Sequence, residues 1–393
     1  MQSTTQAAVE TTHTLPLAEA SQPGRLVSLD VFRGITVMAM ILVNNPGDWG
    51  HIYAPLEHAE WHGCTPTDLI FPFFLFIVGV SCVYALDGVK RRAEPLGPVL
   101  WRVVRRGAVL IGLGLFMAYF LKWDLATLRL PGVLQRIGLV FIACGTVFLT
   151  TSWRTQLWLL ASLLIGYNLL EQLVPAPGAT EAVLLPGKDF GAWLDRTVLG
   201  ENHLWASSRT WDPEGLLGTL PAIGTGLLGV LTGQWLRRPN IAPAEKVVWL
   251  MVDAVLLIVL GLIWNSWFPV NKSLWTSSYV LYTGGMAVAG LATLYWLCDV
   301  QGWRRWTKPF LVYGVNAITV FFLSGLLARG LNTWKVAGPN GTPVSVKTLL
   351  YQQFFVPYFS DPRDASLAGA LACVLIWLVV LWGMYARRII IKV

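Results

Sequence analysis

The sequence is poor in charge. Charged residues make up 13% of its 393 residues, against about 25% in an ordinary soluble domain, whereas 55% are hydrophobic and 20 are tryptophan. So few charges cannot cover the surface of a soluble protein of this length, and the composition predicts an integral membrane protein. The net charge of +7 is typical of basic cytoplasmic loops, and no nucleic-acid-binding motif is present.

Cysteine is also scarce. The five cysteines are spaced neither as a zinc site nor as a disulfide framework, so we expect small buried side chains without a ligand role. Residues 1–24 are polar and contain no apolar core of the signal-peptide kind. We expect this stretch to be a short disordered cytoplasmic tail.

Long apolar runs dominate the rest. A spanning helix needs about 20 mostly apolar residues, and we find about ten such runs. They lie near 28–46, 67–87, 100–120, 131–150, 156–174, 215–236, 246–268, 274–297, 309–330 and 366–386. The sequence therefore predicts an all-α polytopic membrane bundle, with residues 25–393 as one domain and outer loops at 47–66, 175–214 and 331–365.

The basic residues orient this bundle. Lys and Arg concentrate in alternate loops, as the positive-inside rule requires of cytoplasmic loops. These loops hold Arg25, Lys90, Arg91, Arg92, Arg102, Arg105, Arg106, Arg154, Arg237, Arg238, Lys246, Arg304, Arg305, Lys308, Arg387, Arg388 and Lys392, whereas loop 47–66 has neither Lys nor Arg. The pattern predicts an even number of spans, both termini in the cytoplasm, and loop 47–66 on the far side.

Titratable residues gather in that far-side loop and at the start of the next span. They are His51, Glu57, His58, Glu60, His62 and Asp68. Ionisable groups at a membrane edge are a functional-site hypothesis by default. His58 and His62 have the i, i+4 spacing of metal ligands on a helix, but too few further ligands support them, and we expect no metal. Trp193, Trp205 and Trp211 in loop 175–214 fit either an aromatic belt or a surface that stacks on sugar rings.

Several motifs, spread from residue 25 to about 390, resemble the heparan-α-glucosaminide N-acetyltransferase family, and within it the short bacterial NagX-type members. The matching stretches are RLVSLDVFRG at 25–34, VN at 43–44, HAEWHG at 58–63, TDLIFP at 67–72, LPGVLQR at 130–136, WDPEGLLGT at 211–219 and FPVNKSLWTSSY at 268–279. The resemblance implies that acetyl-CoA is held from the cytoplasmic side and that its acetyl group crosses to an amino sugar. It also implies a homodimer.

The resemblance carries the family's proposed catalytic histidine onto His58, a nearby asparagine onto Asn44, and the aspartate that opens the next helix onto Asp68. Acetyl transfer to an amine needs a base and donors to the developing oxyanion. His58 suits the base, and Asp68 would orient its ring, cap its own helix, or do both. Asn44 would donate to the thioester carbonyl oxygen or make an interhelical hydrogen bond. His58 acts either as a base in a ternary complex, which we favour, or as a covalent acetyl carrier.

Coenzyme A carries phosphates, which arginine binds in bidentate fashion. The predicted cofactor-binding set is Asp30, Arg33, Arg105, Gln135 and Arg136. An Asp30–Arg33 ion pair and snorkelling of Arg105 are the structural alternatives. The predicted acceptor-binding set is His62, Trp211, Asp212, Glu214, Asn271 and Lys272. Asp212 and Glu214 would otherwise cap the helix that starts near 215.

Three functions remain open from the sequence. The first is a transmembrane acetyltransferase that uses acetyl-CoA and a glucosamine-like amine. The second is a sugar transporter, although no paired halves are evident. The third is an O-acyltransferase of surface glycans. Because neither a signal peptide nor an added outer domain of the animal kind precedes the shared core, we expect a multi-pass protein of a bacterial inner membrane, with loop 47–66 in the periplasm.

Overall fold

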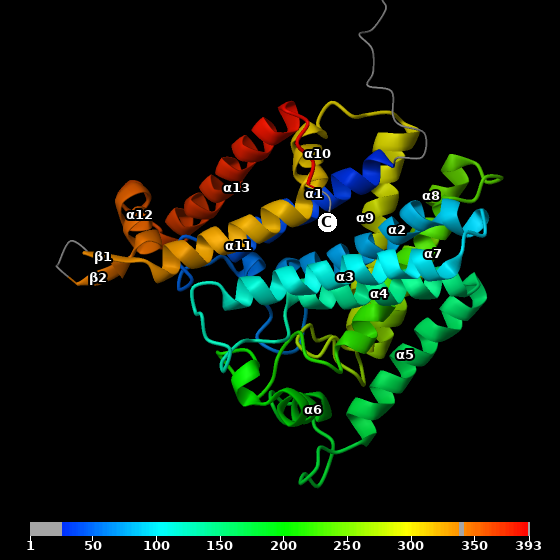
Figure 1. The fold of residues 1–393 in the computed structure, drawn as a ribbon, viewed down its shortest axis with the longest axis horizontal. Coiled ribbons are helices and arrows are strands. Elements are labelled where there is room, and N and C mark those ends of the chain that lie inside the picture. Colours follow the sequence, from blue (N-terminus) through cyan, green and yellow to red (C-terminus); the bar gives the residue numbers. More distant parts are fainter. Residues whose placement is uncertain (1–25, 338–341, 392–393) are drawn as a thin grey trace, which may run out of the picture.

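The computed structural model describes residues 26–337 and 342–391, so the predicted tail at 1–24 lies outside the described residues, as do Arg25 and Lys392. The described chain is an all-α bundle with one two-stranded sheet (Figure 1). Its long helices are α1 (Val27–Asn44), α2 (Ile70–Arg91), α3 (Leu96–Tyr119), α4 (Val133–Thr150), α5 (Trp153–Leu173), α7 (Thr219–Leu236), α8 (Pro243–Trp264), α9 (Ser277–Leu294) and α13 (Pro362–Ala386). Each coincides with a predicted span to within a few residues.

The predicted span 309–330 is not one helix. It is divided into α10 (Lys308–Val315) and α11 (Ala317–Thr333), which meet at Asn316 with a bend of 78°. Within the described residues, six helices are long and apolar enough to cross a membrane, or up to seven if this bent pair forms one span. Helix α3 is not among them, and it carries three arginines near its start: Arg102, Arg105 and Arg106.

The two long loops that were predicted to lie outside contain structure that the sequence did not indicate. Loop 175–214 holds the short helix α6 (Phe190–Leu199), which begins at the side-chain cap of Asp189. Loop 331–365 holds the hairpin of β1 (Lys335–Ala337) and β2 (Pro343–Ser345), followed by α12 (Val346–Phe354). These segments have at most 10 residues, so they are too short for the runs of about 20 apolar residues on which the span prediction depends.

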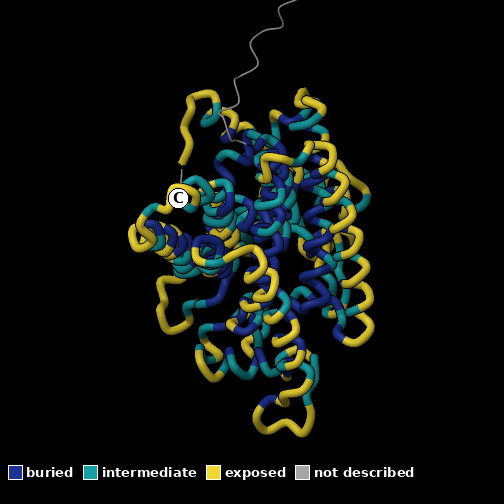
Figure 2. Tube along the Cα trace, turned by 90° about the vertical axis from the view of Figure 1, so that its right-hand side faces the viewer, coloured by how far each residue is buried: buried dark blue, intermediate teal, exposed yellow. Residues whose placement is uncertain are grey.

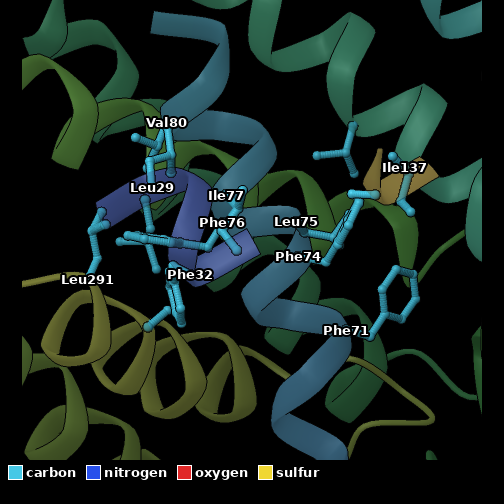
Figure 3. Close-up of a cluster of buried hydrophobic side chains, with 14 of the residues drawn as sticks. Leu29, Phe32, Phe71, Phe74, Leu75, Phe76, Ile77, Val80, Ile137 and Leu291 are labelled. Carbon is cyan, nitrogen blue, oxygen red and sulfur yellow. The ribbon is translucent and has the colours of Figure 1, made fainter. Parts of the chain in front are cut away.

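Helix α2 lies at the centre of the bundle and packs against α1, α4, α7 and α9. Its side chains Leu75, Phe76 and Ile77 are almost completely buried, and Figure 3 shows them between Phe32 of α1 and Ile137 of α4. The outer helices differ. Only 17% of the apolar window of α8 and 22% of that of α13 are buried inside the molecule, and Figure 2 shows exposed outer faces around a buried interior. Exposed apolar faces of this kind are what helices present to lipid.

Gly79 allows α2 and α7 to touch backbone to backbone. A Cβ atom at this position would stand 1.9 Å from the carbonyl oxygen of Gly226. We therefore expect the Gly79→Ala variant to lose about 1–3 kcal/mol of stability, because overpacking forces two central helices apart. Thermal unfolding in detergent measures this loss. Gly112→Ala on α3 is the control, since its Cβ would meet open space, and equal unfolding temperatures for the two variants would contradict the packing account.

Candidate active site

Loop 47–66, which holds His51, His58 and His62, ends in a tight turn that leads into α2. The 3₁₀ turn η2 (Pro66–Leu69) directly precedes α2, and Thr65 caps it. Asp68 completes this cap, because its Oδ2 accepts from the backbone N and the Oγ1 of Thr65, at 3.0 and 3.1 Å. The same oxygen accepts from the backbone N of Ala59 at 3.0 Å. The local sequence therefore fixes the Asp68 carboxylate before any other helix contributes.

The second carboxylate oxygen of Asp68 holds His58. The distance from His58 Nδ1 to Asp68 Oδ1 is 2.7 Å, while the Asp68 side chain is only 1% exposed. An ionised carboxylate only accepts hydrogen bonds, so His58 donates to Asp68 through Nδ1–H. Asp68 thus caps its turn and orients the ring of His58. Both interpretations of Asp68 from the sequence hold together.

Lys272 reaches the same pair from the loop before α9. Its Nζ lies 2.9 Å from Nδ1 and 3.2 Å from Nε2 of His58, and 3.5 Å from Oδ1 of Asp68. Desolvation lowers the pKa of Lys272, although Asp68 and Glu214 act to raise it. The sequence placed Lys272 among the acceptor-binding residues, and the structure brings it into direct contact with His58.

Asn271 shapes the loop that carries Lys272. Its side chain is fully buried, and its Oδ1 accepts from the backbone N of Leu274 at 2.9 Å. Its Nδ2 lies 3.4 Å from Nδ1 of His62, so the two predicted acceptor-binding residues are neighbours. Tyr279 at the start of α9 donates to the carbonyl oxygen of Asp68 at 2.6 Å. The loop before α9 is therefore fastened to the turn before α2.

Trp211 belongs to an aromatic group beside this cluster. Its ring packs edge-on against Trp61 at 5.1 Å and against Trp205 at 5.4 Å. Trp193 takes no part, because it packs on Phe190 within α6. The Trp-rich loop thus divides into a group next to His62 and a tryptophan held in a separate helix.

Arg129 pairs with the two acids of the 211–219 motif. Its guanidinium donates to both carboxylate oxygens of Asp212, at 2.8 and 2.6 Å, and to Oε2 of Glu214 at 2.5 Å. The sequence prediction missed Arg129. Its position in a loop predicted to lie outside, against the positive-inside rule, was the available signal. Asp212 and Glu214 therefore both form ion pairs with Arg129.

A polar pocket lies beneath Trp211 and Asp212. Besides Asp212, the acids that line it are Glu171, Asp189 and Asp195, and Arg136 is the only arginine or lysine among its described lining residues; the empty volume is about 320 Å³. Arg136 is 1% exposed, and its NH2 donates to the carbonyl oxygen of Gly215 at 3.0 Å. Among the described residues, its Nε and NH1 have no hydrogen-bond partner. The three acids come from α5 and α6, and nothing in the sequence indicated that they meet.

Burial raises the pKa of Asp195 to about 7 from its ordinary value of 3.8. The hydrogen bond that Asp195 accepts from Leu216 N acts to lower this pKa but does not offset the effect of burial. Folding therefore favours protonated Asp195. Below pH 3.8 the folded and unfolded chains are both protonated. Between pH 3.8 and about 7 the folded chain holds the additional proton, so stability falls as the pH rises and then levels off.

We expect the Asp195→Asn variant to be more stable than the parent protein at pH 8 by up to a few kcal/mol, at about 1.4 kcal/mol per pKa unit. The difference should vanish near pH 4, because an amide does not titrate. Thermal unfolding across this pH range measures the effect. Glu181→Gln, which removes an exposed acid from the same loop, is the control. Parallel stability curves for Asp195→Asn and the parent would contradict the expectation.

A second, larger cavity lies toward the other end of α1 and α2. It has an empty volume of about 1580 Å³, and its charged lining residues are Asp30, Arg33 and Arg106. Arg33 donates to Oδ1 of Asp30 at 3.1 Å and to Oγ of Ser81 at 2.9 Å, so the predicted Asp30–Arg33 pair is present inside the cavity. The rest of the lining is mostly apolar and comes from α2, α3, α4, the α10–α11 break and the segment after α13.

This large cavity approaches the cluster of His58, Asp68 and Lys272 (the His58 cluster) along α2. Its lining on α2 runs from Ala85 to Phe74, which is about 16 Å of helix. Phe74 is six residues from Asp68, about 9 Å along the chain. The cavity and the histidine cluster therefore lie at successive positions along one central helix.

The structure divides the predicted cofactor-binding set. Asp30 and Arg33 line the large cavity, whereas Arg136 lines the polar pocket. Arg105 is exposed on α3 and lines neither, while its neighbour Arg106 lines the cavity. Gln135 donates from Nε2 to the carbonyl oxygen of Leu130 at 3.1 Å. The sequence could not separate Arg105 from Arg106, because the choice depends on how α3 is rotated about its axis.

Two further predictions concern Asn44 and metal ions. Asn44 is the exposed last residue of α1, and within the described residues no hydrogen bond joins its side chain to His58. In the part of the chain that the structure describes, no group of three or more His, Cys, Asp or Glu residues is arranged to hold a metal ion.

Comparison with known proteins gives a consistent result. A family model described as heparan-alpha-glucosaminide N-acetyltransferase, catalytic, matches residues 25–260. The human protein named heparan-alpha-glucosaminide N-acetyltransferase is 32% identical over 356 residues, which cover 76% of this chain and 52% of the human protein. The mouse protein of the same name is 30% identical over 362 residues, covering 78% and 54% respectively. The chain thus spans about half the length of these curated relatives.

Proposed function

Since the chain belongs to the heparan-alpha-glucosaminide N-acetyltransferase family, we propose that it is a membrane acetyltransferase that moves the acetyl group of acetyl-CoA to the amine of a glucosamine-like sugar. The observation that carries the proposal is the arrangement along α2. A cavity with two arginines lies along α2 from Phe74 to Ala85, and the His58–Asp68–Lys272 cluster lies just before the first residue of this helix. This arrangement matches a donor held on one side of the bundle and an acceptor on the other.

Acetyl-CoA would occupy the large cavity. Arg33 and Arg106 offer two guanidinium groups to its phosphates, and the apolar side chains of α2 offer a surface to its acyl arm. The lining reaches to about 9 Å from Asp68 along the helix, so an extended pantetheine arm would bring the thioester toward His58. Asp30 would hold Arg33 in place.

His58 would act as the base of a ternary complex. The amine nitrogen attacks the thioester carbonyl carbon, the C–S bond breaks, and the thiolate of coenzyme A leaves. His58 takes the proton of the amine on Nε2 and returns it to the thiolate, while Asp68 stabilises the charged ring. Lys272 would leave the ring and donate to the oxyanion. Asn44 remains a candidate for that donor role from the far end of α1.

The acceptor would bind where the aromatic group and the 271–272 loop meet. Trp211 offers an apolar ring to one face of the sugar, and His62 and Asn271 offer polar atoms beside it. The side chains of Asp212 and Glu214 are 0% and 9% exposed where they pair with Arg129, so they would position the motif at 211–219 beside the sugar and would not contact its hydroxyl groups directly.

We further propose ten membrane spans with both termini in the cytoplasm, loop 47–66 in the periplasm of a bacterial inner membrane, and a homodimer. The basic loops support the orientation, and the long helices α3, α5 and α7 supply the spans beyond those that pass on length and composition. The exposed apolar faces of α8 and α13 support contact with lipid.

The direct test incubates the purified protein in detergent with acetyl-labelled acetyl-CoA and glucosamine. We expect the label on the sugar nitrogen. N-acetylglucosamine, which has no free amine, should accept nothing, and its acetylation on oxygen would favour the O-acyltransferase. Uptake of glucosamine into vesicles that contain the protein but no acetyl-CoA would favour the transporter.

A further inference from the structure

The segment that follows α13 turns back and forms part of the wall of the large cavity. Helix α13 ends at Ala386, and Arg388 takes the left-handed conformation, with φ of 57°. The backbone N of Ile389 then donates to the carbonyl oxygen of Met384 at 2.9 Å, which closes the helix end. Only then do Ile390 and Ile391 reach the cavity, and Figure 1 shows this red segment returning beside α10.

Asn316 recognises the backbone of this segment. It is the residue at the break between α10 and α11, and it is 1% exposed. Its Nδ2 donates to the carbonyl oxygen of Ile389 at 3.0 Å, and its Oδ1 accepts from the backbone N of Ile391 at 3.0 Å. One side-chain amide thus uses both its donor and its acceptor, as a neighbouring strand would, and this pair of bonds fixes the register of the segment.

The break and the segment form one wall. The residues on both sides of Asn316 also line the cavity, namely Gly314, Val315, Ala317 and Ile318. The bend at Asn316 therefore has a consequence for the cavity, because a straight helix through residues 308–333 would not present this amide to residues 389–391. A polar residue inside an otherwise apolar run is explained by the partner that it holds.

The chemistry of the cavity suggests what this wall contacts. Ile390 and Ile391 are each 50% exposed and line the same cavity as the guanidinium groups of Arg33 and Arg106. A ligand that bears phosphates on one part and a flat or extended apolar surface on another satisfies both sets of residues. Coenzyme A has this character, with its phosphates beside an adenine base and a pantetheine arm.

We propose that residues 389–391 are a strap that closes over the bound cofactor, and that Asn316 is the positioning residue that holds the strap in place. The proposal rests on the proposed function, because it takes the large cavity as the site of coenzyme A. The strap is joined to the bundle through a few hydrogen bonds, so it opens at low cost compared with a helix. The cofactor leaves when the strap opens. A variant that weakens the strap therefore changes mainly the dissociation rate of coenzyme A.

The test measures coenzyme A binding and acetyl transfer in full-length variants. We expect Asn316→Ala, and separately the double variant Ile390→Ser with Ile391→Ser, to raise the Kd and the dissociation rate of coenzyme A by about tenfold or more. The KM for acetyl-CoA should rise in parallel, while the KM for the acceptor and kcat at saturation should stay within about twofold. Asn316→Asp keeps the acceptor for Ile391 but loses the donor, so it should fall in between.

Matched controls come from the same elements. Asn332→Ala removes an amide on α11 that only donates to its own helix, at Ala328 O. Ile389→Ser removes an exposed isoleucine of the strap whose side chain does not line the cavity. Both controls should bind coenzyme A as the parent protein does. The double variant of Ile390 and Ile391 keeps Asn316 intact, so it tests whether the strap holds coenzyme A even where Asn316→Ala fails to fold.

Two failures are distinguishable. If the parent protein does not bind coenzyme A, or if it binds and removal of Arg33 and Arg106 changes nothing, the cavity is not the cofactor site and the strap fails with it. If the parent binds, the arginine variants weaken binding, and the strap variants match their controls, the proposed function stands and the strap is overturned.

Discussion

Replacing His58 by alanine is expected to lower kcat for acetyl transfer by about 10²–10⁴-fold, the usual contribution of a positioned general base. The physical reason is the geometry around its ring. Asp68 holds Nδ1 at 2.7 Å, and Nε2 would take the amine's proton once Lys272, 3.2 Å away, has left it. Among the described residues, no other side chain contacts both Asp68 and Lys272 in this way. Coenzyme A should bind to the variant with unchanged affinity, because His58 does not line the large cavity.

His51→Ala is the matched control for this variant. His51 lies in the same loop and also contacts a carboxylate, Asp48 at 2.7 Å, but the pair is exposed and separate from the cluster. We expect its activity to equal that of the parent protein. Normal turnover in His58→Ala would remove His58 from the chemistry. Recovery of an acetylated His58 from enzyme given acetyl-CoA alone would instead replace the ternary route by the covalent one.

Removing the cavity arginines is expected to separate binding from chemistry. Arg33→Gln and Arg106→Gln should each raise the KM for acetyl-CoA by about 10–100-fold, because a hydrogen bond to a charged group contributes about 1.5–3 kcal/mol. The kcat at saturating acetyl-CoA should change little, since Arg33 lies at the level of Ser81, near the middle of α2, and neither arginine contacts His58. Steady-state kinetics at fixed acceptor concentration give both values.

Arg105→Gln supplies the comparison. It makes the same charge change one residue away on α3, at a side chain that does not line the cavity. We expect the KM for acetyl-CoA to stay within about twofold of the parent value. A rise in KM for Arg105→Gln that matches Arg106→Gln would mean that general positive charge, and not the cavity, attracts the cofactor.

Much of the fold could be predicted because long apolar runs leave little choice in a membrane. Helices such as α1, α8 and α13 were located to within a few residues on this basis. The break at Asn316 was not predicted. A single asparagine in an apolar run does not force a bend, and its partners are residues 389–391, more than 70 positions away. A local pattern carries no information about such a partner.

The candidate site, like the fold, could be predicted from the sequence only in part. His58 and Asp68 are ten residues apart, and the capping sequence around Thr65 fixes their relation locally. The contact of Lys272 with His58 joins two distant loops, so the sequence indicated the residue but not its neighbour. The pocket of Glu171, Asp189 and Asp195 was missed altogether, because helices α5 and α6 bring the three acids together only in the folded chain.

The central claim is that the acetyl group passes from a cavity on one side of the membrane to the His58 cluster on the other. Vesicles that contain the protein, with acetyl-CoA sealed inside and glucosamine attached to an impermeant polymer outside, test it most directly. We predict acetylation of the outer polymer, and none in vesicles with His58→Ala or with both substrates only outside. Acetylation that requires acetyl-CoA and the polymer on the same side, with none across the membrane, would contradict the account.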